Sequence, residues 1–531
     1  MLMSKLIGKT SKRVEEEFNI DSQRLLLRSG MFRSISPGLY AVLPQGKRVI
    51  DKLLNLLSKE LEIKDFQNII IPSNIEFERA VCLTLRNDLK SYKDLPKSIY
   101  NVSSIERKKI KVKDGILKSK SFMALRSFGF YENQQNMLDG FEQIKEIYRI
   151  IFEKIGIDVI EVKSYNDKTP IENCEEFIVT CEGGDREIFN CKGCEYRVLE
   201  EVADFHIREE DIEDMEIEPV HTPGIKTIKE LEEYMNIEAE ELAKTLLLKA
   251  GNETIAVVIR GNRELNLYKL STLLNVPIED IEMADYEDID GKIETVPGFV
   301  GPVELEGVRI IVDREITKTG HLVTGANKRD YHLKNVRYDR DFVGDLVADV
   351  SYVRENDKCP LCGEDMTKKY GVDIGKILNI GKITDIKSME YKNKEGKPNS
   401  IYGVSSYIDI YRLLSMIVEK QHDDDGIVWP VETAPYQVII SILNVKKEDQ
   451  VDLGRRLYNE LKANSIEVIL DDRNERAGAK FNDADILGIP IRIVVARGAS
   501  ENKVEFKLRW ENEKEELGVN EALERVVQLL K

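Results

Sequence analysis

The sequence lacks any long apolar segment. No run of about eighteen apolar residues occurs in the 531 residues, and a helix needs roughly that length to cross a bilayer. The first residues also lack the apolar core of a secretory signal. We therefore expect a cytoplasmic protein that makes no contact with a membrane.

Cysteine is scarce and odd in number, with seven residues in the chain, which argues against a disulfide scaffold. Four of them form two pairs with two residues between the thiols, Cys191 with Cys194 and Cys359 with Cys362. Each pair can fill two corners of a tetrahedron, so together they predict a structural Zn²⁺ site. A catalytic metal is not expected, because four thiolates leave no open position. The alternative is four reduced cysteines in neighbouring strands.

The chain has fewer basic than acidic residues, with 78 Lys and Arg against 96 Asp and Glu, which gives a net charge of −18. This excludes a protein that coats nucleic acid along its whole surface, and no DNA partner is expected. One strip is basic, from Arg107 to Lys120, with candidate RNA contacts at Lys111, Lys113, Lys118 and Lys120. A solvated hairpin is the alternative for that strip.

Residues 220–340 read as a small domain inserted into another, because the two cysteine pairs frame them. Within the insert we expect helices at 229–235 and 241–248 and a buried strand at 255–259. The predicted boundaries are 1–218 and 351–432 for the interrupted domain, 219–350 for the insert and 433–531 for a last domain. Strands alternate with helices in that last domain, which predicts an α/β fold with a largely parallel sheet.

A turn at Gly38, Leu39 and Tyr40 precedes an amphipathic helix at 49–61 and an apolar strand that ends at Pro72. This pattern resembles the first motif of class II aminoacyl-tRNA synthetases, and more narrowly the bacterial-type prolyl-tRNA synthetases. The resemblance covers nearly the whole chain. It implies an α+β and α/β multidomain protein: a class II antiparallel-sheet catalytic domain interrupted by an α/β editing insert, then a C-terminal α/β anticodon-binding domain.

The resemblance places the two ATP-binding arginines of the family at Arg107 and Arg412. Arginine suits this task because its planar fork grips phosphate oxygens and stays charged. Other residues expected at this site depart from the family pattern, namely Lys109, Lys376, Tyr407 and Asp409. The segment from Glu76 to Glu78, where the family has the element that binds the substrate amine, departs as well. We therefore expect the proline-activating site to be degraded or repurposed, with an unusual but active site as the alternative. ATP and Mg²⁺ are expected only if ligase activity survives.

The insert resembles the editing domain that hydrolyses alanine wrongly esterified to the proline tRNA. One methylene gives a binding pocket only about 1–3 kcal/mol of discrimination between two substrates, so a second pocket that selects alanine is needed. The editing residues implied by the resemblance are Lys244, Asp313, His332, Gly298, Gly301 and Pro302. Three of them have an ordinary alternative: Lys244 as an exposed helix residue, Asp313 as a turn cap and His332 as a structural histidine. No Ser-His-Asp or Cys-His arrangement is legible, so no covalent acyl-enzyme is expected.

The last domain is similar to the anticodon-binding domain of class IIa synthetases, which implies RNA contacts at Arg473, Arg476 and Lys480. Local salt bridges are the alternative for each. The function hypothesis is a prolyl-tRNA synthetase relative that binds tRNA(Pro), edits Ala-tRNA(Pro) and has a doubtful activation site. The alternatives are an active proline–tRNA ligase and a non-catalytic tRNA-binding or regulatory protein. The family's mode of pairing implies a homodimer through residues 49–72.

Overall fold

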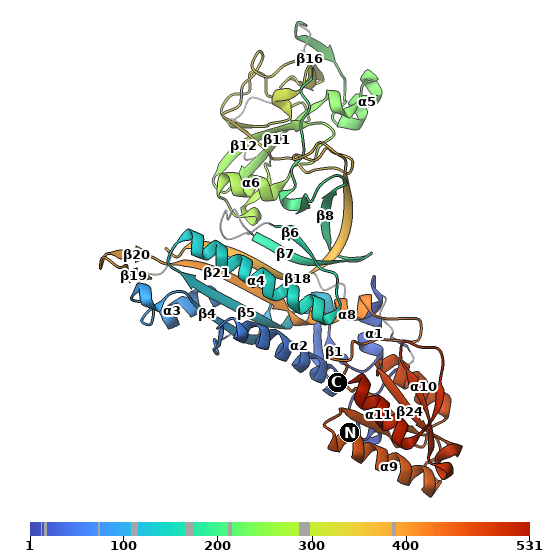
Figure 1. The fold of residues 1–531 in the computed structure, drawn as a ribbon. Helices are drawn as coiled ribbons and strands as arrows, with labels where there is room; N and C mark the ends of the chain where they lie inside the picture. The colour runs from blue at the N-terminus through green and yellow to red at the C-terminus, as the bar shows by residue number, and fades with distance from the viewer. Residues whose placement is uncertain are drawn as a thin grey trace. The chain divides into compact units, whose positions relative to one another are not determined.

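The computed structural model describes residues 1–11, 13–14, 18–72, 75–107, 115–164, 174–210, 215–285, 298–384 and 389–530. The chain divides into two compact units (Figure 1). The first comprises Met1–Glu161, Glu176–Arg186 and Tyr370–Lys531, and the second comprises Val162–Glu175 and Glu187–Lys369. The second unit is larger than the predicted insert, because the stretches that carry both cysteine pairs belong to it.

The first unit is built on a sheet whose strands follow the order β3-β4-β5-β21-β18-β7. The β4–β5, β5–β21 and β21–β18 pairs are antiparallel, which confirms the predicted class II type of sheet. The strands are β3 (Gln67–Asn68), β4 (Lys97–Glu106), β5 (Ser121–Tyr131), β7 (Cys174–Thr180), β18 (Met366–Lys382) and β21 (Tyr402–Asp409).

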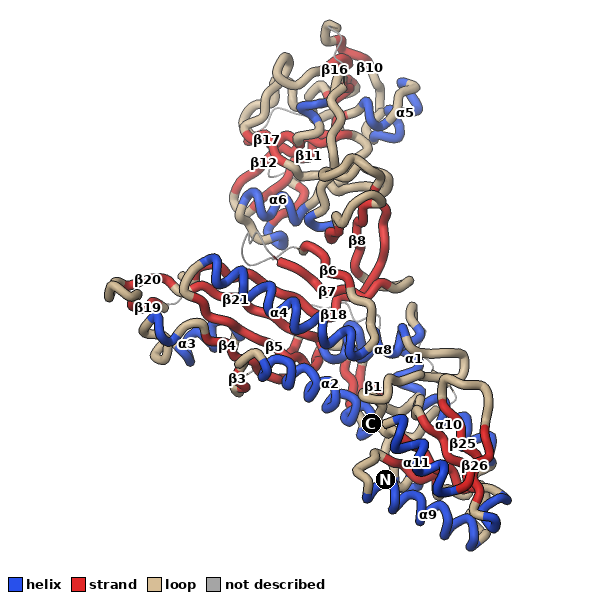
Figure 2. Tube along the Cα trace, viewed as in Figure 1, coloured by secondary structure: helices blue, strands red, loops and turns tan. Residues whose placement is uncertain are grey.

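Helix α4 (Gln134–Ile155) packs on strands β5 and β21 of this sheet (Figure 2). The side chain of Asn133 caps its first turn by accepting the N–H of Asn136 at 2.9 Å. Gly156 ends it with a left-handed φ of 72°. Its apolar residues recur every three or four positions, so one face of the helix is buried in the main core.

Helix α2 (Pro44–Ile63) includes the predicted helix at 49–61 and starts with a proline at its first position. Leu53, Leu57 and Leu61 lie four residues apart and are fully buried. The other elements of this part are α1 (Asp21–Arg28), β1 (Phe32–Ser36), β2 (Leu39–Val42), α3 (Phe77–Leu85), β19 (Glu390–Lys392), β20 (Pro398–Ser400) and α8 (Ile410–Lys420).

The C-terminal part of the first unit has the sheet order β23-β22-β24-β25-β26. Strand β22 pairs in parallel with β23 and β24, whereas β25 and β26 are antiparallel. The sheet is therefore mixed rather than largely parallel. Its elements are β22 (Val438–Ile442), α9 (Glu448–Ala463), β23 (Val468–Asp471), α10 (Ala477–Leu487), β24 (Ile491–Val495), β25 (Lys503–Leu508), β26 (Glu515–Gly518) and α11 (Val519–Leu529).

The second unit contains a sheet in the order β13-β11-β12-β14-β17 and a second sheet in the order β10-β16-β15. Their strands are β10 (Glu218–His221), β11 (Ala243–Ala250), β12 (Glu253–Arg260), β13 (Ile281–Met283), β14 (Arg309–Asp313), β15 (Leu322–Gly325), β16 (Tyr331–Val336) and β17 (Leu346–Ala348). Further elements are β6 (Ile160–Lys163), β8 (Arg186–Cys191), β9 (Arg197–Leu199), α5 (Ile228–Met235) and α6 (Leu267–Leu274).

The predicted helix at 241–248 is wrong, because this segment forms strand β11. Leu247 and Leu248 enter two different apolar clusters, so both faces of the strand are covered. A strand buried on both sides reads as a continuous apolar run, which periodicity cannot separate from a buried helix. Among the described residues, no helix is long and apolar enough to span a membrane.

Candidate functional site

Asp409 lies at the junction of strand β21 and helix α8 in the first unit. Its Oδ1 accepts the backbone N–H of Tyr411 at 2.9 Å and of Arg412 at 3.1 Å, so it caps the helix. Its Oδ2 pairs with the guanidinium of Arg107 and lies 3.9 Å from Nε of Arg412. Asp409 is 1% exposed. One buried carboxylate therefore contacts both arginines that were predicted to bind ATP.

The two arginines have further partners from the chain itself. Arg412 is buried, donates to the carbonyl of Leu117 at 3.1 Å and pairs with the carboxylates of Asp373 and, at 3.3 Å, Asp185. Arg107 donates to the carbonyl of Ser119 at 2.8 Å and stacks on a phenylalanine ring. Burial raises the pKa of Asp373 to about 6, against the opposing charge of Arg412. The charges that would hold a triphosphate are thus balanced internally.

A second set of paired charges follows along the same sheet. Arg186 bonds both carboxylate oxygens of Glu176, at 3.0 Å and 2.9 Å. Lys376, which was noted as a departure from the family pattern, lies 3.2 Å from Glu176. Burial raises the pKa of Tyr407, so its phenol stays neutral. Sequence reasoning missed Asp185, Asp373 and Glu176, because nothing in the local sequence marks them as partners of distant arginines.

The glycine loop predicted for editing is held by Asn327. The amide of Asn327 donates to the carbonyls of Gly301 at 3.0 Å and Val303 at 2.9 Å, and accepts the N–H of Gly301 at 3.0 Å. A Cβ on Gly301 would lie 1.7 Å from the carbonyl oxygen of Gly325, so only glycine fits there. Pro302 follows as a buried residue. Sequence reasoning named Gly301 but not the asparagine that holds it.

Some N–H groups of the loop stay available. The N–H of Gly301 is used by Asn327, whereas those of Phe299 and Val300 donate to no described residue. Gly298 has a left-handed φ of +88° that sets the turn. These two backbone donors can serve an oxyanion.

His332 is 3% exposed and lies between the loop and a threonine. Its Nδ1 is 2.7 Å from Oγ1 of Thr222, and its ring centroid is 5.6 Å from that of Phe299. Burial lowers the pKa of His332 to about 4. The imidazole is therefore neutral near pH 7, which suits a pocket wall. Sequence reasoning missed Thr222 as a partner of His332, because the two residues are 110 positions apart in the chain.

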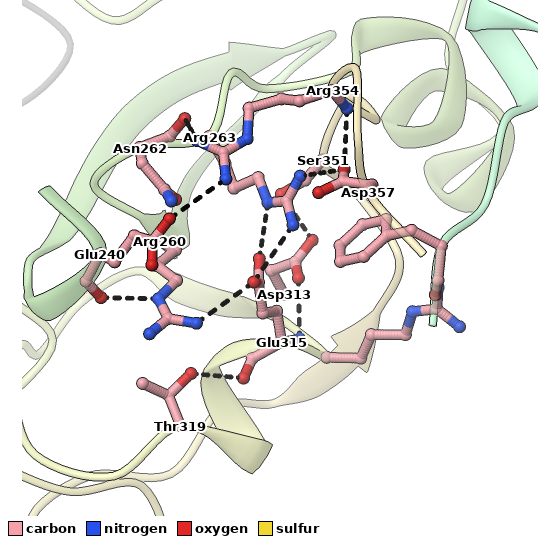
Figure 3. A network of polar contacts seen from close by, with 12 residues as sticks. Glu240, Arg260, Asn262, Arg263, Asp313, Glu315, Thr319, Ser351, Arg354 and Asp357 are labelled. Atoms are coloured by element: carbon pink, nitrogen blue, oxygen red, sulfur yellow. Dashed lines mark hydrogen bonds and ion pairs between the residues drawn. The ribbon is translucent and has the colours of Figure 1, made fainter. Parts of the chain in front are cut away.

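Asp313 is fully buried and serves the local backbone (Figure 3). It accepts the N–H groups of Glu315 at 2.8 Å and Val350 at 3.0 Å and the hydroxyl of Ser351 at 2.8 Å. The neighbouring Glu315 is bound by Arg263, 4% exposed in its side chain. These contacts make Asp313 a structural cap at the end of β14.

Lys244 lies near the start of β11, opposite Ile259 of β12, with its Nζ 3.1 Å from the exposed Glu264. Leu242, two residues earlier, forms a bridge with Val323 of β15, and β15 pairs Gly325 with His332. The pairing thus brings the start of β11 beside the strand that carries the second glycine turn. Within the described residues, no hydrogen bond or ion pair joins Lys244 or Asp313 to His332.

The structure brings Cys191, Cys194, Cys359 and Cys362 together. Their sulfur atoms all lie within 4.8 Å of one another, with 3.3 Å between Cys191 and Cys362 and 3.6 Å between Cys194 and Cys359. Four sulfurs around Zn²⁺ at about 2.3 Å would lie roughly 3.8 Å apart. The donor set and its spacing therefore fit a tetrahedral metal ion.

The predicted RNA contacts differ in exposure. Lys120 and Arg476 are exposed, and Lys118 lies 3.6 Å from Asp185. Arg473 pairs with Asp471 and Asp483, both at 2.8 Å. Lys480 is 0% exposed and donates to the carbonyls of Ile442 at 2.7 Å and Asp471 at 3.1 Å. The RNA contact predicted for Lys480 is corrected, since a completely buried ammonium cannot reach RNA. Lys109, Lys111 and Lys113 lie outside the described residues.

Two domain families match this architecture. Residues 222–342 match the aminoacyl-tRNA editing domain, and residues 437–529 match the anticodon binding domain. Over the whole length of both chains, the sequence is 34% identical to the proline–tRNA ligase of Thermoanaerobacter sp. (strain X514). This chain belongs to the proline–tRNA ligase family. The proline–tRNA ligase of Caldicellulosiruptor saccharolyticus is 32% identical, and the alignment covers all of this chain and 98% of that protein.

Solved structures of the family share the fold. The crystal structure of prolyl-tRNA synthetase from Cryptosporidium parvum complexed with halofuginone and AMPPNP aligns with a TM-score of 0.55 at 12% identity. The alignment covers 99% of this chain and 79% of the Cryptosporidium chain. The family therefore supplies the multidomain fold with an editing and an anticodon-binding domain, as predicted from the sequence.

Proposed function

We propose that this chain hydrolyses Ala-tRNA(Pro) at its editing domain and no longer activates proline at its ATP site. The observation that carries the first half is the glycine loop, in which Gly301 packs against Gly325 without space for a Cβ and is bonded on both sides by Asn327. A loop held so tightly has the fixed geometry that oxyanion stabilisation requires.

In the proposed reaction, water attacks the ester carbonyl of the alanyl group. The N–H groups of Phe299 and Val300 stabilise the oxyanion that forms. The ester C–O bond then breaks, one proton of the attacking water passes to the ribose oxygen and the other to solvent, and alanine leaves as its carboxylate. Lys244 holds the terminal phosphate or ribose after leaving Glu264, which is 82% exposed in its side chain. Neutral His332 limits the size of the pocket, and Asp313 fixes the end of β14.

The second half of the proposal is supported by Asp409. A triphosphate would have to displace this buried carboxylate from Arg107 and Arg412, and also compete with Asp373 and Asp185 for Arg412. Like charges at a phosphate site oppose binding of the nucleotide. ATP and Mg²⁺ enter this account only if ligase activity survives.

An active proline–tRNA ligase is the second candidate. It is favoured by the full-length match to relatives with that name and by the presence of both arginines. The two readings differ in one measurement, proline-dependent exchange of pyrophosphate into ATP. Exchange well above a no-proline control would establish the ligase and remove the second half of the proposal.

The editing half is tested with purified full-length chain and alanine-charged proline tRNA. We expect release of alanine, and a fall of about tenfold or more in the rate for Lys244→Ala, because a charge-assisted contact is worth about 1.5–3 kcal/mol. Lys249→Ala, on the same strand, is the matched control. Intact hydrolysis in Lys244→Ala would contradict the role given to that lysine.

We also propose that the four cysteines hold a structural Zn²⁺. They offer the four soft ligands of a closed tetrahedral site, which adds folding stability and leaves no position for catalysis. The ion would tie the segment around Cys191 to the one around Cys359 in the second unit. Metal analysis of protein purified without chelators, with Cys359→Ser as the comparison, checks this assignment.

The remaining proposals concern the assembly. The anticodon-binding domain supports tRNA(Pro) as the partner, through Lys118, Lys120, Arg473 and Arg476, with Lys111 and Lys113 retained from the sequence. We propose a cytoplasmic homodimer that pairs through residues 49–72, where Ile63 is 69% and Ile70 is 93% exposed. The domain boundaries proposed are 1–218 with 351–432, 219–350, and 433–531.

A further inference from the structure

The first unit contains a cavity of about 590 Å³ that shares no residue with the proposed ATP, editing or metal sites. Its wall is formed by the last turn of helix α4, by residues that follow helix α8 and by the C-terminal part of the unit. The chain has two tryptophans, Trp429 and Trp510, and both line this cavity. Its volume lies within the range of about 300–1,000 Å³ that is typical of small-molecule sites.

The two tryptophans differ in how they are held. Trp429 is 2% exposed, and its indole N–H donates to the carbonyl of Leu487 at 2.9 Å. Trp510 is 49% exposed, and no cation of the described residues lies over its ring. The neighbouring Arg509 bonds both carboxylate oxygens of Asp423, at 2.7 Å and 2.5 Å, which fastens the turn that carries Trp510. Trp510 therefore offers the cavity a free indole ring, the aromatic group that attracts cations best.

Two helices end at this cavity. Helix α4 ends at Ile155 and helix α8 ends at Lys420. The side-chain amide of Gln421 joins the two ends, because it donates to the carbonyls of Ile155 at 3.3 Å and Gly156 at 3.0 Å. The C-terminal end of a helix carries a partial negative charge of about half an elementary charge. Both helix ends therefore favour a cation in the cavity.

The ionisable side chains that line the cavity leave one negative charge without a partner. Glu153 is exposed and forms no ion pair with a described residue. Lys154 is paired with Glu60 at 2.5 Å. Nδ1 of His422 lies 3.0 Å and 3.1 Å from two backbone carbonyls, and its Nε2 lies 3.8 Å from the carboxylate of Asp21, so a positive charge on this ring would already be balanced. The carboxylate of Glu153 is thus available to a ligand.

We propose that this cavity binds a small organic cation, a protonated amine or a quaternary ammonium that carries an apolar group. The positive charge would lie between the indole of Trp510 and the carboxylate of Glu153, and the apolar group would lie against Val428 and Pro430, which also line the cavity. The two helix ends and Glu153 oppose an anion at the same place, so a free phosphate or the backbone of RNA does not fit.

The test is calorimetric titration of the full-length chain with benzyltrimethylammonium chloride, beside benzyl alcohol and sodium benzoate at the same ionic strength. We expect saturable binding of the ammonium compound, one molecule per chain, and binding about fivefold weaker or less for the neutral and the anionic compound. Because both tryptophans line the cavity, the intrinsic tryptophan fluorescence should change along the same saturation curve.

Substitutions at the two charge-binding side chains locate the site. Trp510→Leu keeps an apolar side chain but removes the aromatic face, so it should weaken the ammonium compound by about fivefold or more, and Trp510→Phe should recover part of the loss. Glu153→Gln should weaken it by about two- to fivefold, because a charge pair at an exposed position contributes little. Glu146→Gln, two turns earlier on α4, is the matched control and should leave binding unchanged.

Trp510 is half exposed, so its replacement leaves the core in place, and circular dichroism of each variant checks the fold. The proposal is overturned if the ammonium compound does not bind, if benzyl alcohol or benzoate binds as tightly, or if folded Trp510→Leu binds it as the unaltered chain does. Binding heat without a change in fluorescence would also overturn it, by placing the cation elsewhere. Editing and pyrophosphate exchange are separate assays, so failure of either proposed activity leaves this inference standing.

Discussion

The proposed ATP site and the proposed editing site both carry residues of the family pattern, but the partners of those residues differ. Arg107 and Arg412 are present, yet both are bonded to the buried carboxylate of Asp409. In the editing domain, Gly301 and His332 are held by neutral partners, Asn327 and Thr222, that leave no opposing charge. The presence of a functional side chain therefore decides less than what that side chain already binds.

The largest effect is expected for a substitution at Gly301, which tests the editing half of this comparison. A Cβ would collide with the carbonyl of Gly325 at 1.7 Å, so Gly301→Ala must displace the loop. A shift of about 1 Å in a positioned group can cost roughly a hundredfold in rate, and we expect at least that loss of Ala-tRNA(Pro) hydrolysis. Gly478→Ala is the control, because nothing lies near its Cβ. Equal activity of the two variants would show that the loop is not part of the site.

The next effect concerns the ATP side. Asp409→Ala leaves Arg107 and Arg412 without their shared carboxylate, and breaking a buried ion pair costs about 3–5 kcal/mol. We expect that loss in the free energy of unfolding measured with urea, without any gain of pyrophosphate exchange. Asp21→Ala is the matched control, since Asp21 pairs with Arg24 at an exposed site, where a pair is worth about 0–1 kcal/mol. A gain of exchange in Asp409→Ala would instead show that Asp409 alone blocks the site.

The pH dependence of stability sharpens the comparison at His332. Its pKa is about 4 in the folded chain and about 6.5 when unfolded. The unfolded chain thus binds the extra proton first, and stability falls as the pH drops from about 6.5 to about 4. The loss should reach about 2–3 kcal/mol. Urea midpoints across this range for the unaltered chain and His332→Gln check it, with exposed His206→Gln as the control. A dependence that persists in His332→Gln would assign it to another group.

Local patterns were enough for much of the fold. The predicted helices at 49–61 and 229–235 lie within α2 and α5, and the predicted strand at 255–259 lies within β12, because their periodicity and their flanking residues agree. Strand β11 was missed because both of its faces are buried, which erases the alternation that marks a strand. Tertiary contacts determine the secondary structure of that segment, and its own sequence does not indicate a strand.

The candidate sites were predictable as residues but not as contacts. Arg107 and Arg412 were found from motifs, and Asp409 was noted as a departure. The pairing of Arg107 with Asp409 joins residues 302 positions apart, so it depends on the register of β4, β5 and β21. The same limit applied to Lys480, which lies in a well-preserved motif but points into the interior. Burial of a charged residue is set by its partners, and those come from other elements.

The smallest effect extends the comparison to the anticodon-binding domain, where Arg476 and Lys480 are four positions apart. Arg476 is exposed, so Arg476→Ala should weaken tRNA binding a few-fold and reduce its salt dependence by about one charge. Lys480 is buried with its ammonium on two carbonyls, so Lys480→Met should lower the free energy of unfolding and leave the salt dependence unchanged. Filter binding of the proline tRNA at several salt concentrations separates the two. If Lys480→Met alone reduced the salt dependence, this helix would have to open to bind RNA. Burial in the free protein would then not separate the cations that contact RNA from those that do not.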